Sequence, residues 1–556
     1  MRKLWSVSVS ILALGAGAYA QVPARQPVPP TVQTRSDVAA DILPAESARL
    51  IRSGDSAMAR ADLSGAVASY VRAAQAAPDA LLPRLLAGVA LTSSQRLTLA
   101  ANSFKEAHRL AESDLLTTFM LIGALEAVGD QAAAQELYLQ TARDPRFHTA
   151  GRPGFDASSS IAYLKQAAAA FPGSPTIALL IGDAEQLMGS FPQAEAAYRQ
   201  SLKLAPKWVK PRLSLARVQI AQGQSQRAVE TVEAALREDP DNVPAQIAKG
   251  EALVRAGKPK EAILTVQKLE HIDSATVLNI LARANLSQGK LNAAENYADR
   301  AQKSSPRDPN ASVMQGVVRS KQGDYSGAAS AYTQALKLTR ESGLFDAQPS
   351  LFRALTEAQL SAGRPADALS TLREAAEQEP DLVPIWERLS AQAHESLGDS
   401  TAMEEDLRQA LEAEQGLNPQ ETLQAINKRG LIEKEIAYYV TQLSIARTGV
   451  GANASTGVSI TGGTPSKANE IRCLAALGYL YRFSDDAPNE VDVRRDLCQL
   501  RGTGVDWFLL AEAQEHKIER RDALTSYQQA LSKGGLTRVA WERAKARIKA
   551  LESRPQ

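Results

Sequence analysis

Histidine and cysteine are the side chains of this sequence best suited to bind a metal ion or act as a nucleophile, and both are scarce. The 556 residues include five histidines and two cysteines. His394 and Glu395 begin a motif typical of zinc proteases, His-Glu-x-x-His, but Gly398 stands where the second histidine would be. Two histidine ligands therefore cannot share one helical face there. The other four histidines are far apart in the sequence, so we expect no shared metal site.

Phosphate-binding and acyl-transfer motifs are also missing. Residues 449–454 fit a loose Gly-x-Gly-x-x-Ala pattern, but the dinucleotide fingerprint needs a strand before it and a helix that opens within it. Here the sequence predicts a helix before the pattern and a polar loop after it. Neither a Gly-x-x-x-x-Gly-Lys-Ser/Thr phosphate loop nor a Gly-x-Ser-x-Gly nucleophile elbow occurs. The motifs therefore predict no catalytic residue and no cofactor.

Cys473 and Cys498 both lie within residues 416–503, a region without the repetition described below. In an oxidising compartment they would close a short loop as a disulfide, which would stabilise the fold by about 3 kcal/mol. We predict this disulfide. Two free buried thiols or a redox pair are the alternatives, and a redox pair would more typically be Cys-x-x-Cys, which is absent.

The charge balance excludes a protein that mainly coats nucleic acid or an anionic membrane. Lysine plus arginine is 63 and aspartate plus glutamate is 62, whereas such proteins usually carry a basic surplus. We therefore expect no nucleic-acid partner. Hydrophobic residues make up 44% of the chain and aromatic residues only 5%. The core must accordingly be built from alanine, leucine and valine.

The first 20 residues predict export. Arg2 and Lys3 are followed by a short apolar stretch and by Ala18-Tyr19-Ala20, a small-residue cleavage site. We predict a signal peptide over 1–20, cleaved after Ala20, and a mature protein that is periplasmic or secreted. An uncleaved membrane anchor is the alternative, but the stretch is shorter than a membrane span needs. Residues 21–44 form a proline-rich spacer, and no later segment predicts a membrane span.

A period of about 34 residues organises most of the remaining chain. Gly182, Gly189, Tyr198 and Pro206 belong to one spaced set, and equivalent residues recur in the copies on either side. If a repeat is numbered from residue 175, positions 4, 7, 8 and 11 form one face of a first helix, and positions 20, 24 and 27 form one face of a second. Small residues at 8 and 20 allow close packing, and glycine at 15 allows the turn. Each pair leaves a face uncovered, so the pairs must stack.

This register resembles the tetratricopeptide repeat family. The resemblance covers eleven repeats, which start near residues 47, 81, 115, 175, 209, 243, 275, 309, 349, 383 and 504. It implies an all-α fold, a right-handed α-solenoid of stacked antiparallel helix pairs. We place the solenoid at 45–415, irregular at 143–174, and the final repeat at 504–534. Residues 535–556 form a capping helix and tail.

Residues 416–503 break the period and predict an irregular helical insert. A helix should run from 419 to about 446, followed by a mobile loop over 448–466 that is rich in glycine, serine and threonine. Further helices are expected over 467–483 and about 490–500. An enzyme or maturation factor with its chemistry in this insert is one alternative function.

The resemblance implies that positions 2, 5, 9, 12 and 13 of each repeat line an inner groove. The middle of this groove is mostly basic, with Lys210, Arg217, Arg255, Asn279, Arg283, Lys321 and Arg353 beside the acidic Glu251 and Glu357. The section before it is apolar, with Ile51, Met58, Leu82, Leu85, Leu116 and Phe119. We predict that the middle binds an acidic peptide or protein, with an acidic polysaccharide as the alternative. The lysine and asparagine pairs with which some family members hold a chaperone's terminal carboxylate are absent.

The sequence therefore predicts a non-enzymatic protein-binding scaffold of the bacterial cell envelope. Family analogy suggests a role in envelope assembly or polysaccharide export. A second alternative is a chaperone-like holdase that captures unfolded exported proteins at the apolar end of the groove.

Overall fold

The computed structural model describes residues 43–143, 156–272, 274–341, 349–414, 419–448, 450–452, 459–461 and 465–553. The predicted signal peptide, and the predicted spacer as far as residue 42, lie outside these residues. Among the described helices, none has both the length and the hydropathy needed to cross a membrane. The chain divides into two compact units, Met1–Ala362 and Gly363–Gln556.

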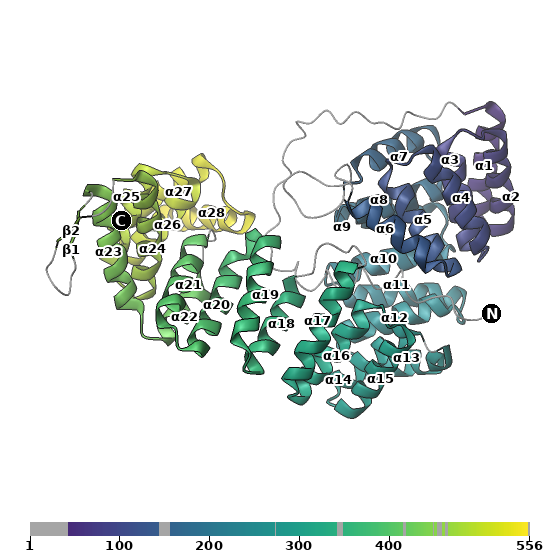
Figure 1. The fold of residues 1–556 in the computed structure, drawn as a ribbon. Helices are drawn as coiled ribbons and strands as arrows, with labels where there is room; N and C mark the ends of the chain where they lie inside the picture. The colour runs from purple at the N-terminus through teal and green to yellow at the C-terminus, as the bar shows by residue number, and fades with distance from the viewer. Residues whose placement is uncertain are drawn as a thin grey trace. The chain divides into compact units, whose positions relative to one another are not determined.

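The first unit consists of consecutive packed helices, purple to teal in Figure 1. They are α1 (Ala45–Ala59), α2 (Leu63–Ala76), α3 (Leu81–Ser93), α4 (Leu97–Leu110), α5 (Leu115–Val128), α6 (Gln131–Arg143), α7 (Ser158–Ala170), α8 (Pro175–Leu187), α9 (Phe191–Leu204), α10 (Val209–Ala221), α11 (Ser225–Glu238), α12 (Val243–Arg255), α13 (Pro259–Val266), the 3₁₀ helix η4 (Gln267–Ile272), α14 (Ala275–Ser287), α15 (Leu291–Ser304), α16 (Pro309–Gln322), α17 (Tyr325–Glu341) and α18 (Pro349–Ser361).

The second unit, green to yellow in Figure 1, is helical except for one short hairpin. It contains α19 (Pro365–Gln378), the 3₁₀ helix η5 (Pro380–Leu382), α20 (Val383–Leu397), α21 (Ser400–Ala413), α22 (Gln420–Lys428), α23 (Ile432–Thr448), β1 (Val450–Ala452), β2 (Ser459–Thr461), α24 (Lys467–Phe483), α25 (Ala487–Leu500), α26 (Gly504–His516), α27 (Arg520–Lys533) and α28 (Arg538–Glu552). The strands pair antiparallel with Val450 opposite Thr461. The predicted all-α architecture of helix pairs is confirmed.

Several helix pairs are held by a close contact between a glycine at position 8 and a bulky residue at position 24. A Cβ atom added to Gly54 would lie only 2.4 Å from the ring of Tyr70, and one added to Gly182 only 2.5 Å from the ring of Tyr198. Both tyrosines are fully buried. The contact explains why these pairs carry glycine at position 8, since a larger side chain there would push the two helices apart.

The turn between paired helices has a left-handed residue at position 15, whether or not that residue is glycine. Glycine fills the position in most repeats, with φ of 68° at Gly189 and 76° at Gly223. Ala61, Gln95 and Ile518 occupy the same position with φ of 62°, 61° and 70°. A left-handed conformation costs an L-residue about 1–2 kcal/mol. The packing of the two helices therefore imposes the turn, and glycine only makes it less costly.

The region predicted as an irregular insert contains two further helix pairs with the same turn. The single helix predicted over 419–446 is wrong, because the chain turns at Gly430 (φ 69°) between α22 and α23. In the next pair, Asp485 has φ 64° at the turn. Only parts of the loop predicted over 448–466 lie within the described residues, and these include the hairpin.

An arginine replaces the usual bulky apolar residue in the α24–α25 pair. Arg494 packs over Gly478, where an added Cβ would lie 2.9 Å from the Arg494 guanidinium carbon. The guanidinium lies 4.9 Å from the centre of the Tyr479 ring and donates to Glu490 at 3.2 Å. Arg494 and Glu490 are both buried, so each needs the other to compensate for its lost hydration. A buried arginine in the place of tyrosine conceals this repeat in the sequence.

The disulfide predicted between Cys473 and Cys498 is absent, because both side chains are free thiols. Cys473 on α24 packs with Leu477 and Leu480. Cys498 on α25 packs with Val491 and Leu510 in a separate cluster. Burial raises the pKa of Cys473 to about 11 and the pKa of Cys498 to about 12. The alternative of two free buried thiols describes the structure.

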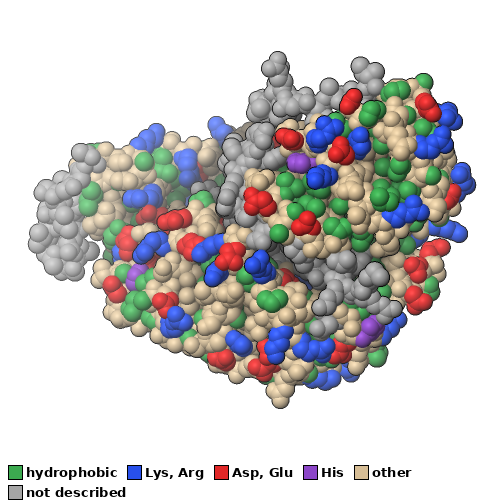
Figure 2. All heavy atoms as spheres, turned by 45° about the vertical axis from the view of Figure 1, so that its right-hand side comes forward, with side chains coloured by type: hydrophobic (Ala, Val, Ile, Leu, Met, Phe, Trp, Pro, Cys, Tyr) green, Lys and Arg blue, Asp and Glu red, His purple; other side chains and the backbone are tan. Residues whose placement is uncertain are grey.

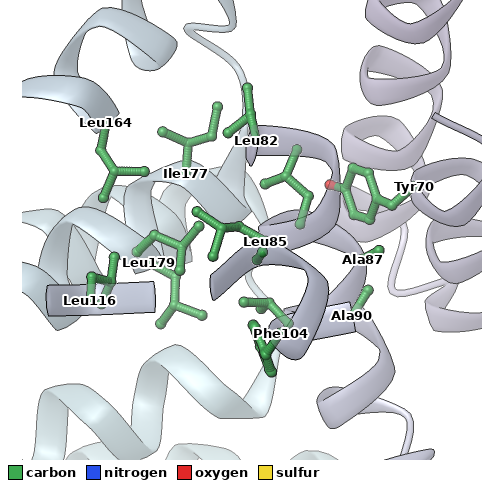
Figure 3. Close-up of a cluster of buried hydrophobic side chains, with 14 of the residues drawn as sticks. Tyr70, Leu82, Leu85, Ala87, Ala90, Phe104, Leu116, Leu164, Ile177 and Leu179 are labelled. Atoms are coloured by element: carbon green, nitrogen blue, oxygen red, sulfur yellow. The ribbon is translucent and has the colours of Figure 1, made fainter. Parts of the chain in front are cut away.

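Helix α8 covers the apolar section of the predicted groove. Ile51, Leu82, Leu85 and Leu116 are each no more than 2% exposed, because α8 lies against α1, α3 and α5. Figure 3 shows Ile177 and Leu179 of α8 among Leu82, Leu85 and Leu116. The prediction that this section is open to a partner is therefore wrong. Phe119 is the exception among the predicted residues, since it remains partly exposed.

Polar groups fix α8 in this position. Asp55 of α1 accepts hydrogen bonds from Ser174 Oγ at 2.5 Å and from Tyr70 Oη at 2.7 Å, both at Oδ1. Tyr70 Oη also lies 3.2 Å from Thr176 Oγ1. Asp55 is only 8% exposed, and this burial raises the pKa of its carboxyl to about 6 despite the two hydrogen bonds.

Replacing Ile518 should show that the turn is strained. Ile518 is β-branched, left-handed and 75% exposed, so Ile518→Gly should raise the free energy of unfolding by about 1 kcal/mol. Urea unfolding followed by circular dichroism measures the change. Leu264→Gly is the matched control. Leu264 is equally exposed but lies within α13, where glycine should destabilise by about 1 kcal/mol. If both variants lose stability, the left-handed turn at Ile518 is not strained.

Asp55→Asn should stabilise the protein, and the gain should depend on pH. The folded state raises the pKa of Asp55 from 3.8 to about 6, so it binds the Asp55 proton more tightly than the unfolded state does. Ionisation therefore costs stability above pH 6, by up to about 3 kcal/mol, and the cost disappears as the pH falls towards 4. Asparagine keeps an oxygen acceptor for Ser174 and Tyr70. Thermal unfolding at pH 8 and pH 4 measures the gain in stability. An equal gain at both pH values would show that ionisation of Asp55 is not its cause.

Candidate binding groove

The inner helices of neighbouring pairs carry all the predicted groove residues of the middle section. Helices α8, α10, α12, α14 and α16 are first helices of successive pairs, and each contacts the next first helix. Residues at the same repeat position therefore follow one another across this face. We call the face formed by α8, α10, α12 and α14 the middle groove.

Charged residues of alternating sign occupy position 9 along the middle groove. Asp183 of α8 is followed by Arg217 of α10, Glu251 of α12 and Arg283 of α14. All four are partly buried. Neighbours in this row act on each other: the positive charge of Arg217 opposes the rise that burial causes in the pKa of Asp183. Glu251 acts on Arg283 in the same sense, against the fall that burial causes in its pKa.

Two further cations make the groove net positive. Lys210 of α10 lies near Asp183 and Arg217, and burial lowers the pKa of its ammonium group although Asp183 opposes the change. Arg255 of α12 pairs with Glu251 at 3.6 Å, and its charge contributes to the lowered pKa of Arg283. Each carboxylate of the row therefore interacts with two cations. A site of this kind would be stabilised by an added negative charge.

Of the other three predicted groove residues, Asn279 lies close to a charged residue of the row, whereas Lys321 and Arg353 lie on later helices. Asn279 lies one turn before Arg283 on α14 and is buried, and its Oδ1 has no hydrogen-bond partner among the described residues. Lys321 on α16 is exposed. Arg353 on α18 is exposed and pairs with Glu357 at 2.8 Å. The structure thus brings Lys210 and Arg217 together, and separately Arg255, Asn279 and Arg283.

Asp183 is the groove residue that sequence reasoning missed. It occupies position 9 of the repeat that starts at residue 175, so the same register that identified Arg217 points to it. Tyr198 donates a hydrogen bond to Asp183 Oδ1 at 2.7 Å. The tyrosine that holds the α8–α9 pair together therefore also orients the first carboxylate of the groove.

On the face drawn in Figure 2, basic and acidic side chains are interspersed, in keeping with a formal net charge of +1. His394 Nδ1 lies 2.6 Å from Asp406 Oδ2 and so links α20 to α21. Within the part of the chain that the structure describes, no three histidine, cysteine, aspartate or glutamate side chains are grouped so that they could hold a metal ion.

The comparisons with known proteins agree with this repeat geometry. A family model described as tetratricopeptide repeat matches residues 213–275 and 280–343. A search of curated proteins finds no match.

Among solved structures, the chain is similar to the human IFIT1 dimer with PPP-AAAA, at 12% identity and a TM-score of 0.43, with 84% of this chain and 96% of that chain covered. It is also similar to Naa15/Naa10 bound to HypK-THB, at 15% identity and a TM-score of 0.38, over 84% and 65% of the two chains. For PilF of Pseudomonas aeruginosa the identity is 17% and the TM-score 0.30, over 37% and 92%. The ligands and partners named here belong to those proteins and are not assigned to this chain.

The family match falls on helices α10 to α17, which include three of the four inner helices of the middle groove. The same close contact at positions 8 and 24 and the same left-handed turn recur outside the matched residues. Arrays of such repeats are scaffolds for protein interactions. The family match identifies residues 213–275 and 280–343 as tetratricopeptide repeats, and the recurring contact and turn support the same assignment for the other helix pairs.

Proposed function

We propose that this protein is a non-enzymatic scaffold of the bacterial cell envelope whose middle groove binds an acidic segment of a partner protein. The observation that carries the proposal is the charge of the groove: four partly buried cations, Lys210, Arg217, Arg255 and Arg283, face two carboxylates, Asp183 and Glu251. Burial disfavours the charged forms of Lys210 and Arg283. A carboxylate-rich ligand relieves that cost, and the relief favours its binding.

Location in the envelope is supported by the first 20 residues, with two basic residues, an apolar stretch and a small-residue cleavage site. Envelope assembly or polysaccharide export would be the process served. An acidic polysaccharide carries the same carboxylates as an acidic protein, so it is the alternative ligand of the same groove. The holdase alternative requires an exposed apolar section of the groove. Helix α8 covers most of those apolar residues, which disfavours it.

Charge reversal in the groove should abolish binding of an acidic partner. We expect Arg217→Glu combined with Arg283→Glu to weaken the binding of a fluorescent ten-residue polyglutamate peptide at least tenfold, because two attractive charges become repulsive. Fluorescence anisotropy at low and at physiological salt measures the affinity, which should fall with salt.

The matched control reverses Arg199 and Lys337, which are exposed on the second helices α9 and α17 and pair with residues one turn away. This control should retain the affinity and the circular dichroism spectrum of the unmodified protein. Polygalacturonate as a competitor distinguishes the two ligands: displacement at equal carboxylate concentration would favour the polysaccharide. Unchanged peptide affinity in the groove variant would refute the proposed site.

Export predicts a defined N-terminus for the mature protein. Protein purified from the source cell should begin at Gln21, since signal peptidase cleaves after a small residue such as Ala20. N-terminal sequencing of the periplasmic and cytoplasmic fractions checks this. A chain that begins at Met1 in the cytoplasmic fraction would contradict the proposed location.

A further inference from the structure

A cavity of about 470 Å³ lies at the start of the middle groove, within the first unit. Its walls come from helices that are distant in sequence, mainly α5 and α10, with contributions from the ends of α1, α4 and α12. A volume of this size falls within the range of small-ligand sites. The cavity exists because α8 covers only part of the apolar inner face, and Phe119 remains partly exposed beside it.

The cavity has an apolar wall with open space in front of it. Phe104, Phe119, Met120 and Leu213 line this wall. Gly123 of α5 also lines the cavity, and a Cβ atom added to it would meet no heavy atom within 4 Å. Gly123 occupies position 9, where the later repeats carry the charged row. Because Gly123 has no side chain, this repeat leaves open the space that a charged side chain occupies at position 9 in those later repeats.

Cationic side chains also line the cavity. Lys210 and Arg217 of α10 line the cavity. Both side chains are partly buried, so a carboxylate bound in the cavity would compensate for the hydration that these cations lose. Asp239 also lines the cavity and is exposed. Glu126 lines it too, but burial raises the pKa of its carboxyl to about 7. Its negative charge is therefore only partial at neutral pH.

We propose that this cavity is the anchor site of the groove and takes an apolar side chain of the partner peptide together with an adjacent carboxylate. The apolar side chain packs between Phe119, Met120 and Leu213. The carboxylate pairs with the Arg217 guanidinium and lies beside Lys210. This inference rests on the proposed function, because it specifies which part of an acidic partner the groove recognises.

The groove itself favours a peptide over a free amphiphile. Arg217 belongs both to the cavity wall and to the charged row that continues to Glu251 and Arg283. An extended chain anchored at Arg217 can place its next acidic residues against the cations of α12 and α14. A fatty acid would use the cavity but not the row, so it is the competing outcome of the test.

Two blocked fluorescent peptides test the anchor on the full chain. One is ten glutamates, and the other replaces the two central glutamates by leucine. We expect the leucine-containing peptide to bind at least tenfold more tightly, because only it fills the cavity. In Gly123→Leu the new side chain occupies the cavity, so the two peptides should bind equally. Leucine also favours helix over glycine, and a thermal melt confirms that the variant folds.

Gly123→Ala is the matched control, since a single methyl group leaves most of the cavity open and the leucine preference should persist. Arg217→Gln should weaken the leucine-containing peptide at least tenfold. Equal affinity of both peptides for the unmodified protein would overturn the anchor while leaving the proposed function intact, and failure of both to bind would overturn the proposed function first. Dodecanoate that binds the cavity without displacing the leucine-containing peptide would also overturn the anchor.

Discussion

The structure depends on the close approach of two helices at position 8, which most repeats fill with glycine or alanine. Gly54 against Tyr70 and Gly182 against Tyr198 show how little space remains between the backbones. This approach fixes the angle between paired helices and imposes a left-handed turn even on Gln95 and Ile518. Because every pair repeats the geometry, equivalent positions on the first helices align and can form one continuous face.

The inner face of the helix pairs differs in character between the N-terminal repeats and those that follow. At the N-terminal end it is apolar, and the chain's own helix α8 covers it through Ile177 and Leu179. Farther on, α10, α12 and α14 present partly buried charges. Burying apolar surface within the molecule is favourable in water, whereas burying Arg217 or Lys210 without a partner is costly. Most of the apolar section therefore packs within the chain, and the proposed ligand site lies on the charged section.

The second unit shows that the repeat geometry tolerates unusual chemistry. Arg494 fills the space that an aromatic ring fills in other pairs, and Glu490 compensates its charge within the core. The pair α24–α25 keeps the same close contact at Gly478 and the same turn at Asp485. Shape, rather than residue type, is therefore what the position requires. A pattern that expects tyrosine, phenylalanine or valine there does not find this repeat.

The sequence by itself determined the helix pairs, their period and the register of the groove residues. These features depend on contacts between residues about sixteen apart, such as Gly182 and Tyr198, and a fixed spacing reveals such contacts. Arg217, Arg255 and Arg283 could be placed on the inner face for the same reason.

Only the tertiary structure decided which parts of that face are open. The contact of α8 with α1 joins Ser174 to Asp55 across more than a hundred residues, and no periodic pattern encodes it. The thiols of Cys473 and Cys498 pack into separate clusters, which spacing along the chain could not show. The cavity beside Arg217 likewise exists only because helices from distant repeats meet around Gly123. Periodic spacing specifies contacts between neighbouring helices, whereas long-range packing depends on which helices of distant repeats meet within a unit.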